Sequence, residues 1–340
     1  QKLKEAMIKS ARLIQKSSFD EISKIVNEAL KLGSENDFGY EYIDDFEERF
    51  MIKSRNPVTT GWDYIDEISR GGLGKGELGV TIASTGSGKS MALVHLGAQA
   101  LLKGETVVHY TLELGSTVIA TRYDSCITRV PLSQTYNFKD DIYEQIKDVK
   151  GKLIIKEYPT KSASPKTIRN HLERLYQRDI KPGMIIVDYA DLLKPTVIYK
   201  EKRHDLETIY EDLRAIAQEH DCPIWTASQT NRSGLNAEVI TMESISEAFN
   251  KCFVADFIFT LSRTVGDKRT DSGRIFVAKN RNGPDGVVFP ITMRTSNVFI
   301  EVHRHLDEIP VENVVKSAKD YKQELEKKYK KFTKKGADNG

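Results

Sequence analysis

The chain has 340 residues, of which 39% are hydrophobic and 29% charged, a balance typical of a soluble globular protein and not of a disordered or membrane chain. A chain of this length can bury a large core, so we expect one large domain with an appendage. The net charge of only +2 excludes a generally basic surface, and any affinity for nucleic acid must therefore come from basic residues placed locally in a pore or groove.

Membrane and secretory signals are absent from the sequence. No stretch approaches the roughly 18 uninterrupted apolar residues that a membrane helix needs, and the N-terminus lacks the apolar core of a signal peptide. We therefore expect an intracellular protein with no membrane partner. Cys126, Cys222 and Cys252 lie far apart without a CxxC pair, which favours reduced, structural thiols over a zinc site or a disulfide.

The first 56 residues predict a helical appendage. Residues 1–32 carry apolar side chains at helical spacing and predict two short amphipathic helices. The polar, aromatic residues 33–50 predict a linker, and we interpret their acidic cluster as a solvated face and not as a metal site. The first residue is Gln1 and not Met, so we expect a fragment or a processed product. The compact domain is expected to begin near Pro57.

From Pro57 onward, short apolar runs alternate with helical patterns, which is typical of an α/β fold with a mostly parallel central sheet flanked by helices. The continuous apolar runs GVTIAS and MIIVDYA predict central strands that are buried on both faces. The later strands are expected to be antiparallel at one edge of the sheet. Strands are predicted at residues 79–84, 107–112, 153–156, 184–190, 224–228, 257–261, 275–278 and 287–293.

The run ASTGSGKS at residues 83–90 follows an apolar strand and precedes a helical pattern, as a phosphate-binding loop must. Glycines let the backbone curl so that its amides converge on phosphate oxygens, and the helix that starts near Lys89 adds its positive end. Ala83 stands where the usual motif has glycine, which ordinary strand dihedrals would tolerate. The residues expected to hold ATP are Ser84, Thr85, Gly86, Ser87, Gly88, Lys89, Ser90 and Met91.

Three further residues are expected around the phosphates. Lys89 should bridge the β- and γ-phosphates, while the Ser90 hydroxyl should bind Mg²⁺. Asp188 ends the apolar strand MIIVD about one hundred residues later, and such a carboxylate organises Mg²⁺ through water. Glu113 ends the strand VVHYTLE, which we expect to be adjacent to the loop's strand, with its tip beside Lys89. We assign Glu113 as the catalytic base or water-orienting residue.

Two polar segments follow later strands. Gln229 ends the strand PIWTASQ, where its amide can sense the γ-phosphate, although a bond to loop backbone remains the alternative. Lys279 and Arg281 follow another strand before the sharp turn Asn-Gly-Pro and have no obvious acidic partner in the sequence. Such cations suit the charge of a phosphoryl group in transfer, in the same chain or across a subunit interface. An ordinary ion pair fits them equally well.

Taken together, these segments resemble the RecA-like motor domain of replicative helicases of the DnaB type, from bacteria or phages. The resemblance covers residues 57–296 and rests on TTGWDYID, the GG of GGLGKGEL, ASTGSGKS, YTLE, IIVDYADLL, SQTNR and AKNRNGP, in the family's order. SQTNR and AKNRNGP are the more selective motifs. The sequence departs from the family at Asp191, where a glutamine is usual, close to the second nucleotide-binding motif.

The resemblance implies a ring-shaped homo-hexamer that binds ATP and Mg²⁺ between subunits and moves 5′ to 3′ on single-stranded DNA, in the cytoplasm of a bacterial or phage-infected cell. It also implies that Arg281 is a finger acting on the neighbouring subunit's nucleotide, with Lys279 as its companion. A primase or a helicase loader is the implied partner. Residues 1–32 resemble the family's linker helix, which docks on the neighbouring subunit.

Contacts to DNA are expected in residues 194–204 and 232–247, because these segments follow strand ends that would face a central pore. Phosphate contacts there would give sequence-independent binding, although each lysine alone also fits a solvated surface charge. The candidates are Lys200, Lys202, Arg203, Arg232, Ser233 and Gly234. The motor domain is assigned to residues 57–310, and the lysine-rich residues 311–340 are expected to form an exposed helix or a loose tail.

Three alternatives stay open from the sequence. A recombination or branch-migration ATPase shares the TGW lead-in and a KNR-containing motif, although this chain has no four-cysteine zinc module and no protease-like extension. A regulatory ATPase of the circadian-clock kind would have two adjacent glutamates where Glu113 is followed here by Leu114. A nucleotide-binding assembly subunit without turnover is the third alternative.

Overall fold

The computed structural model describes residues 42–43, 55–196, 202–230, 239–240 and 252–304. The chain divides into two compact units, residues 1–54 and residues 55–340. Only residues 42–43 of the first unit are described, so the division predicted from the sequence, into residues 1–56, 57–310 and 311–340, stays a prediction. The predicted helices of residues 1–32 and the lysine-rich tail lie outside the described residues.

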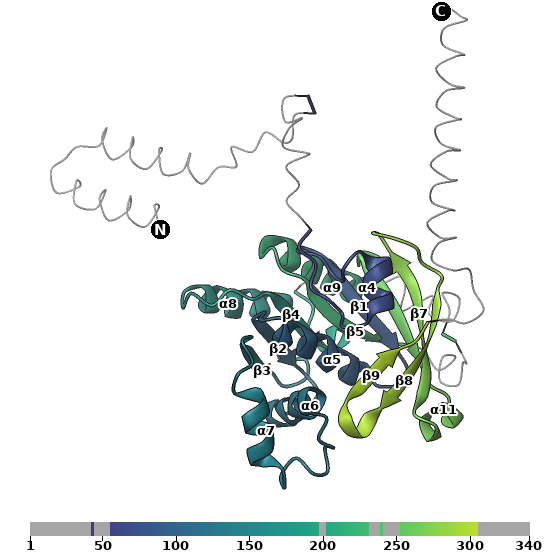
Figure 1. Cartoon of the computed structure of the whole chain (residues 1–340). Coiled ribbons are helices and arrows are strands. Elements are labelled where there is room, and N and C mark those ends of the chain that lie inside the picture. The colour runs from purple at the N-terminus through teal and green to yellow at the C-terminus, as the bar shows by residue number, and fades with distance from the viewer. Residues whose placement is uncertain (1–41, 44–54, 197–201, 231–238, 241–251, 305–340) are drawn as a thin grey trace, which may run out of the picture. The chain divides into compact units, whose positions relative to one another are not determined.

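A sheet of nine strands forms the centre of the second unit (Figure 1), in the order β3-β2-β4-β5-β1-β6-β7-β8-β9. The strands from β3 to β6 are parallel to their neighbours, and β7, β8 and β9 continue the sheet in antiparallel fashion. The strands are β1 Leu78–Ala83, β2 Val107–Thr111, β3 Leu153–Glu157, β4 Met184–Asp188, β5 Ile224–Gln229, β6 Phe257–Ser262, β7 Ser272–Asn280, β8 Val288–Arg294 and β9 Phe299–Val302.

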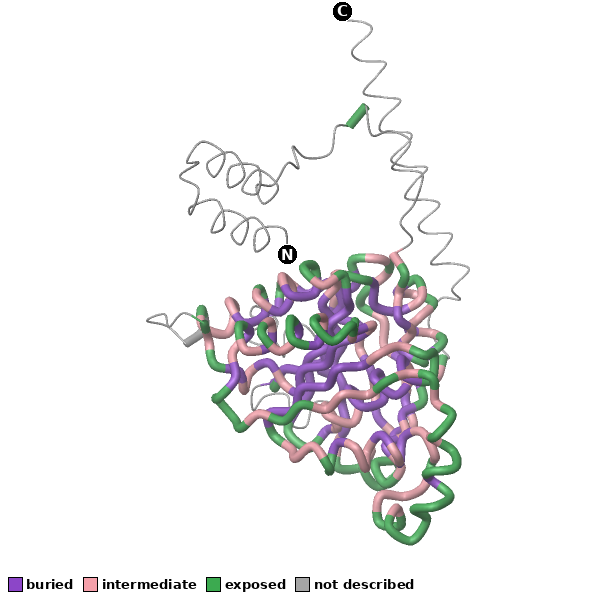
Figure 2. Tube along the Cα trace, turned by 90° about the vertical axis from the view of Figure 1, so that its left-hand side faces the viewer, coloured by how far each residue is buried: buried purple, intermediate pink, exposed green. Residues whose placement is uncertain are grey.

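Helices cover both faces of the sheet and create two hydrophobic cores. Helices α5 and α6 lie over one core, and α8 and α9 over the other. The central strands are therefore buried on both faces, and Figure 2 shows them in purple. Side chains alternate between the cores along each strand, as strand geometry requires: in β4, Ile186 faces the first core and Ile185 the second. The helices are α4 Asp63–Ser69, α5 Lys89–Leu102, α6 Ser116–Thr128, α7 Lys139–Ile146, α8 Pro165–Tyr176, α9 Lys202–Glu219 and α11 Val265–Arg269.

The expected α/β architecture is confirmed, with two corrections. Central strands β1 and β4 are buried along their whole length, and the later strands are antiparallel at one edge, as predicted. The strand predicted at residues 184–190 ends at Asp188, because Ala190–Leu192 turn into a short 3₁₀-helix. The expectation that the strand before Glu113 neighbours the loop's strand is wrong, since β4 and β5 separate β2 from β1. All three cysteines are buried and stand outside any disulfide.

Candidate nucleotide-binding site

The glycine-containing loop, residues 84–88, joins the carboxyl end of β1 to the start of α5. Gly86 and Gly88 adopt φ angles of +70° and +104°, in the left-handed region that favours glycine. A Cβ atom at Gly88 would lie 2.0 Å from Cε of Met293 on β8, so a side chain there would collide with the core. Ala83 is the last residue of β1 and has no positive φ, so the missing first glycine of the motif introduces no strain.

The polar groups of the loop converge on one small volume. The hydroxyls of Ser84 and Ser87 are hydrogen-bonded at 2.5 Å. Lys89 Nζ turns back and donates to the carbonyl oxygens of Ala83 and Ser84, both at 3.3 Å. An ammonium group over the loop and the amino end of a 14-residue helix together make a site that attracts a phosphate group.

Asp188 ends β4 on the same edge of the sheet and is fully buried. Burial raises the pKa of its carboxyl to about 6; Ser90, Arg122 and Lys89 act to lower the pKa, and Glu113 raises it further. Although Ser90 lies close enough to have this effect, neither carboxylate oxygen has a hydrogen bond of ordinary geometry to a described residue. Two unpartnered buried oxygens call for a partner, and a hydrated Mg²⁺ beside Ser90 fits them.

Glu113 follows β2, and it lies at this edge of the sheet because β2 pairs with β4, not with β1. Strands β2 and β4 pair in parallel, with Thr111 opposite Asp188, and the Leu112 amide donates to the Asp188 carbonyl at 2.9 Å. The exposed Glu113 carboxylate therefore lies near enough to Asp188 to raise its pKa. Arg122 on α6 interacts with both carboxylates, while burial lowers its own pKa. The sequence analysis missed Arg122, because it belongs to no motif.

Gln229 is the last residue of β5, next to β1 in the sheet. Its side-chain Nε2 donates to Thr85 Oγ1 of the phosphate loop at 2.6 Å, and its backbone amide donates to Asp191 at 3.3 Å. Asp191 also accepts from the hydroxyl of Tyr210 at 2.7 Å, so its carboxylate links the end of β5 to α9. Gln229 is therefore in direct contact with the loop through its side chain.

Lys279 and Arg281 lie at the opposite edge of the sheet. Strand β7 is antiparallel to β6, with Asn280 opposite Phe257, so β7 ends where β6 and β1 begin. The six residues of β1 separate this edge from the phosphate loop, a distance of about 20 Å at about 3.3 Å per residue. Neither cation can therefore reach the loop of its own chain, which excludes the alternative of action in the same chain.

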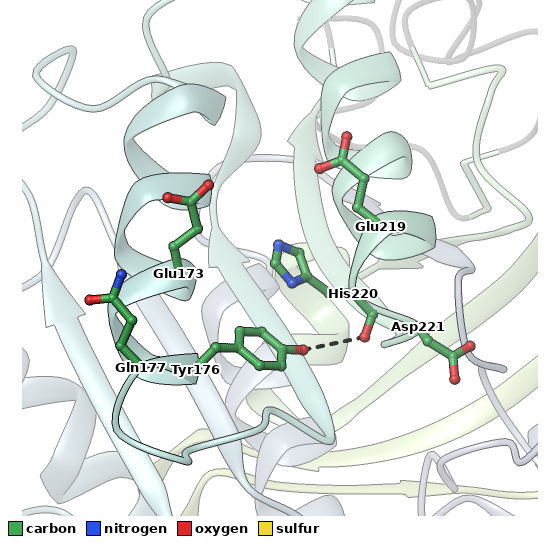
Figure 3. Close-up of a pocket in the computed structure, with 6 residues that line it drawn as sticks. All are labelled: Glu173, Tyr176, Gln177, Glu219, His220 and Asp221. Atoms are coloured by element: carbon green, nitrogen blue, oxygen red, sulfur yellow. Dashed lines mark hydrogen bonds between the residues drawn. The ribbon is translucent and has the colours of Figure 1, made fainter. Parts of the chain in front are cut away.

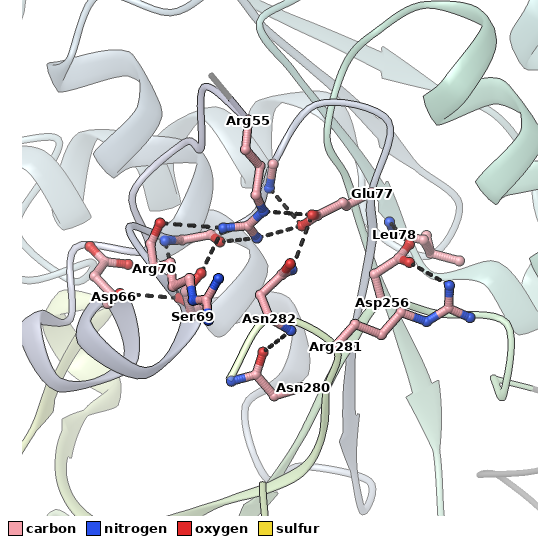
Figure 4. Close-up of polar contacts among 12 residues, drawn as sticks. Arg55, Asp66, Ser69, Arg70, Glu77, Leu78, Asp256, Asn280, Arg281 and Asn282 are labelled. Carbon is pink, nitrogen blue, oxygen red and sulfur yellow. Dashed lines mark hydrogen bonds and ion pairs between the residues drawn. The ribbon is translucent and has the colours of Figure 1, made fainter. Parts of the chain in front are cut away.

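Both cations have partners that the sequence analysis did not find. Arg281 Nη1 lies 3.2 Å from Oδ1 of the buried Asp256 (Figure 4), so Arg281 forms an ion pair within the chain. Lys279 Nζ donates to the Phe253 carbonyl and lies 4.4 Å from the centre of the Phe253 ring. Asp256 directly precedes β6, the apolar strand that pairs with β7, and this position in the sequence could have identified it as the partner of Arg281.

The residues expected to contact DNA are not placed by the structure. Lys200, Arg232, Ser233 and Gly234 lie outside the described residues. Lys202 and Arg203 are described only as the first residues of α9, without their side chains. Their roles remain predictions from the sequence.

A hollow of about 540 Å³ lies elsewhere, where α8 and α9 end (Figure 3). The ring of Tyr176 stacks on that of His220 at 5.2 Å between centres. Strands β4 and β5 start shortly after these helix ends, so this hollow lies at the amino edge of the sheet, whereas ligands of α/β sheets bind at the carboxyl edge. It is not the nucleotide site. Its lining residues are Glu173, Tyr176, Gln177, Glu219, His220 and Asp221.

Within the described part of the chain, His, Cys, Asp and Glu side chains form no group of three that could hold a metal ion by themselves. A Mg²⁺ site of the present kind does not need such a group, because phosphate oxygens and water supply most of its ligands. No described helix is both long enough and apolar enough to cross a membrane.

Comparison with known proteins relates this arrangement to one group of helicases. The model of the DnaB-like helicase C-terminal domain matches residues 57–299. The DnaB-like replicative helicase of Enterobacteria phage T4 is 30% identical over 278 residues, which cover 77% of this chain and 58% of that protein. The replicative DNA helicase DnaB of Haemophilus influenzae is 26% identical over 253 residues, which cover 68% of this chain and 52% of that protein.

Two solved structures share the fold. One, described as an ATPase domain, superposes with a TM-score of 0.64 at 17% identity, over 77% of this chain and 97% of that chain. A DnaB-like replicative helicase, described with its interactions with primase, superposes with a TM-score of 0.65 at 16% identity, over 87% of this chain and 75% of that chain. These likenesses confirm the predicted RecA-like fold. The chain spans about half the length of the curated relatives it matches. By the match over residues 57–299, the chain belongs to the DnaB-like helicase C-terminal domain family.

Proposed function

We propose that the chain is the ATP-hydrolysing motor of a replicative DNA helicase that moves 5′ to 3′ on single-stranded DNA and unwinds duplex at the replication fork. One observation carries the proposal: the phosphate loop and the unpartnered Asp188 lie at one edge of the sheet, and the cations Lys279 and Arg281 at the other. Two half-sites on opposite edges of a chain fit together when copies associate head to tail. The T4 phage relative is a DnaB-like replicative helicase.

In this proposal the loop residues bind the triphosphate of ATP. The loop amides and the amino end of α5 hold the phosphates, and Lys89 bridges the β- and γ-phosphates. Ser90 and Asp188 hold Mg²⁺, which neutralises phosphate charge when it is bound. Glu113 orients the attacking water, and the exposed position of its carboxylate leaves room for that water.

Gln229 is proposed to report the state of the γ-phosphate. The Gln229 amide donates to Thr85 of the phosphate loop, so a phosphate oxygen and Thr85 would compete for the same donor. Release of that amide would move the end of β5 and the chain that follows, where Arg232, Ser233 and Gly234 are the proposed DNA contacts. Lys200, Lys202 and Arg203 are proposed for the second DNA-contacting loop.

The proposed assembly is a homo-hexameric ring with nucleotide between subunits, working with a primase or a helicase loader in the cytoplasm of a bacterial or phage-infected cell. Support for a ring comes from Arg281, which cannot serve its own loop, and from the family match. A solved relative is described with its interactions with primase. A Lys279–Arg281 pair from the neighbouring subunit would stabilise charge on the transferring phosphoryl group.

The test is the rate of ATP hydrolysis with and without single-stranded DNA, measured together with the mass of the assembly with and without Mg·ATP. The proposal expects a nucleotide-dependent ring and hydrolysis that single-stranded DNA stimulates. A tailed duplex then tests unwinding and its direction. Hydrolysis that DNA does not affect would favour a regulatory ATPase, filaments on DNA without unwinding would favour a recombination ATPase, and binding without turnover would favour an assembly subunit.

A further inference from the structure

The buried carboxylate of Asp256, whose side chain is only 5% exposed, is contacted by groups from three other parts of the chain. The Leu78 amide at the start of β1 donates to Oδ2 at 3.0 Å. Arg214 on α9 binds both oxygens, through Nε and Nη2, at 3.1 Å each. Arg281 Nη1 lies 3.2 Å from Oδ1 (Figure 4).

The main chain fixes the same geometry. The Asp256 amide donates to the Leu78 carbonyl at 2.8 Å, and the Arg281 amide donates to the Asp256 carbonyl at 3.0 Å. Beside Arg281, the Asn282 side chain donates to Glu77 at 3.1 Å and the Asn280 side chain to the Ile68 carbonyl at 2.8 Å. The backbone that carries Arg281 is therefore held on both sides, and only the guanidinium end remains to be oriented.

The guanidinium of Arg281 is only partly used by this contact. Its side chain is 45% exposed, and among the described residues only Nη1 has a charged partner. Arg214 already binds the carboxylate with a two-pronged contact, so Arg281 takes the remaining place. Its Nε and Nη2 can therefore bind two oxygens of an anion while Nη1 keeps its contact with Asp256.

We propose that Asp256 is a positioning residue for Arg281: it holds the guanidinium at the amino edge of the sheet, so that the arginine meets the phosphate oxygens of a nucleotide bound by a neighbouring copy of the chain. This inference rests on the proposed function and adds a residue that does not itself touch the nucleotide. Without this contact the guanidinium would have to be immobilised each time it meets the phosphate, which lowers the rate. Misplacement of such a group by about 1 Å can reduce the rate about 100-fold.

The test is Asp256→Asn, which keeps an acceptor for the Leu78 amide and removes the charge. We expect kcat for ATP to fall by about 10- to 100-fold while KM stays within about twofold, because the phosphate loop of the variant is intact. Arg214→Gln is the matched control, since it removes hydrogen bonds from the same carboxylate and leaves the Asp256–Arg281 pair in place. Its unfolding temperature should fall about as much, but its kcat should stay close to that of the parent chain.

Mixed assemblies show on which side of the interface Asp256 acts. Subunits with Asp256→Asn mixed with Lys89→Ala subunits should regain turnover, because each intact loop can then face an intact Asp256–Arg281 pair. Subunits with Asp256→Asn mixed with Arg281→Ala subunits should not, because both lack the same half-site. Recovery in the second mixture, or no recovery in the first, would overturn the inference.

Two further results would also overturn the inference. One is a fall in kcat that is equal in Asp256→Asn and Arg214→Gln and follows their loss of stability, as a purely structural role predicts. The other is normal turnover in Asp256→Asn alongside lost turnover in Arg281→Ala, which leaves the proposed function intact. Normal turnover in Arg281→Ala itself would instead remove the cation that the proposed function places across the interface, and the inference would fall with it.

Discussion

The ammonium group of Lys89 lies over the phosphate loop and interacts with two of its carbonyls. Lys89→Ala removes the only charged side chain of the run ASTGSGKS, so we expect ATP binding or turnover to be lost. Equilibrium binding of a fluorescent ATP analogue and the rate of hydrolysis measure these effects. Lys103→Ala is a matched control, because Lys103 is an exposed lysine at the other end of α5. Ordinary ATP affinity and hydrolysis in Lys89→Ala would refute the loop assignment.

His95 makes the stability of the fold sensitive to acid. Complete burial, and to a smaller extent the charge of Arg129, lowers the pKa of His95 from 6.5 to about 3. As the pH falls through 6.5, the unfolded chain binds a proton that the folded chain refuses, so stability decreases from that pH down to about pH 3. The loss amounts to about 2 kcal/mol at about pH 5. His109, whose pKa burial also lowers to about 3, acts in the same direction.

The variant that isolates this effect is His95→Phe. The His95 ring stacks on Trp62 at 4.7 Å between centres, and neither ring nitrogen has a hydrogen bond of ordinary geometry, so a phenyl ring replaces it without loss of a strong bond. Urea unfolding at about pH 7 and about pH 5 measures the difference. Between these values the parent chain should lose about 2 kcal/mol more than the variant. Equal losses in the two chains would contradict the prediction.

Contacts between side chains that are distant in the sequence were the part of the site that could not be predicted from it. The motifs located Lys89, Ser90 and Asp188 because backbone shape and ligand chemistry act over a few neighbouring residues. The partner of Arg281 depends instead on how β6 pairs with β7. No acidic partner is apparent among the sequence neighbours of Arg281, because Asp256 comes close only when these strands pair. The antiparallel register places Asp256 beside Arg281, although the two residues are 25 positions apart in the sequence. No local sequence pattern determines that register.

Helix α5 carries Lys89 at its first position and owes its own placement to a close contact with α6. A Cβ atom at Gly97 would lie 2.1 Å from the hydroxyl oxygen of Tyr123 and 2.7 Å from Cδ1 of Ile186. Gly97→Ala should therefore destabilise the fold by about 1–3 kcal/mol, although alanine is the better helix former. Urea unfolding measures the change.

Tyr123→Phe separates crowding from other causes of this loss. Alone it removes the hydrogen bond between the tyrosine hydroxyl and His109 Nδ1, at 2.9 Å, and should cost stability. Combined with Gly97→Ala it also removes the atom nearest to the new methyl group, so the double variant should lose less than the sum of the single losses. Strictly additive losses of stability would show that crowding between the new methyl group and Tyr123 is not the reason for glycine at position 97.

Eight of the nine described strands were predictable one by one, but β9 and the order of the strands were not. Buried apolar runs such as MIIVD at β4 mark a strand wherever it lies in the sheet, and this accounts for the agreement at β1, β2 and β5. The position of β2 beyond β4 depends on how far each crossover carries the chain, which the sequence of the strand does not encode. The error over Glu113 followed from this, since sequence neighbours were taken for neighbours in the sheet.

At the scale of the whole molecule, the two edges of the parallel sheet carry different parts of the proposed site. The carboxyl edge gathers loop amides, Lys89 and the buried Asp188, which suit a nucleotide with its metal. The amino edge carries the exposed Arg281 and the partly buried Lys279, about 20 Å away along β1. Because one chain cannot close this distance, the proposed site combines the carboxyl edge of one copy with the amino edge of another.

Arg281→Ala tests this division of the site between copies. The variant keeps its own loop, so we expect ATP to bind as it does to the parent chain, while hydrolysis falls by about 10³-fold or more with the loss of the cation. Mixing the variant with Lys89→Ala subunits, each inactive alone, should restore part of the turnover, since some interfaces then pair an intact loop with an intact Arg281. Full DNA-stimulated turnover by Arg281→Ala alone would contradict the shared site. Failure of the mixture to recover, in assemblies shown to contain both variants, would show that Arg281 does not act on the nucleotide of a neighbouring copy.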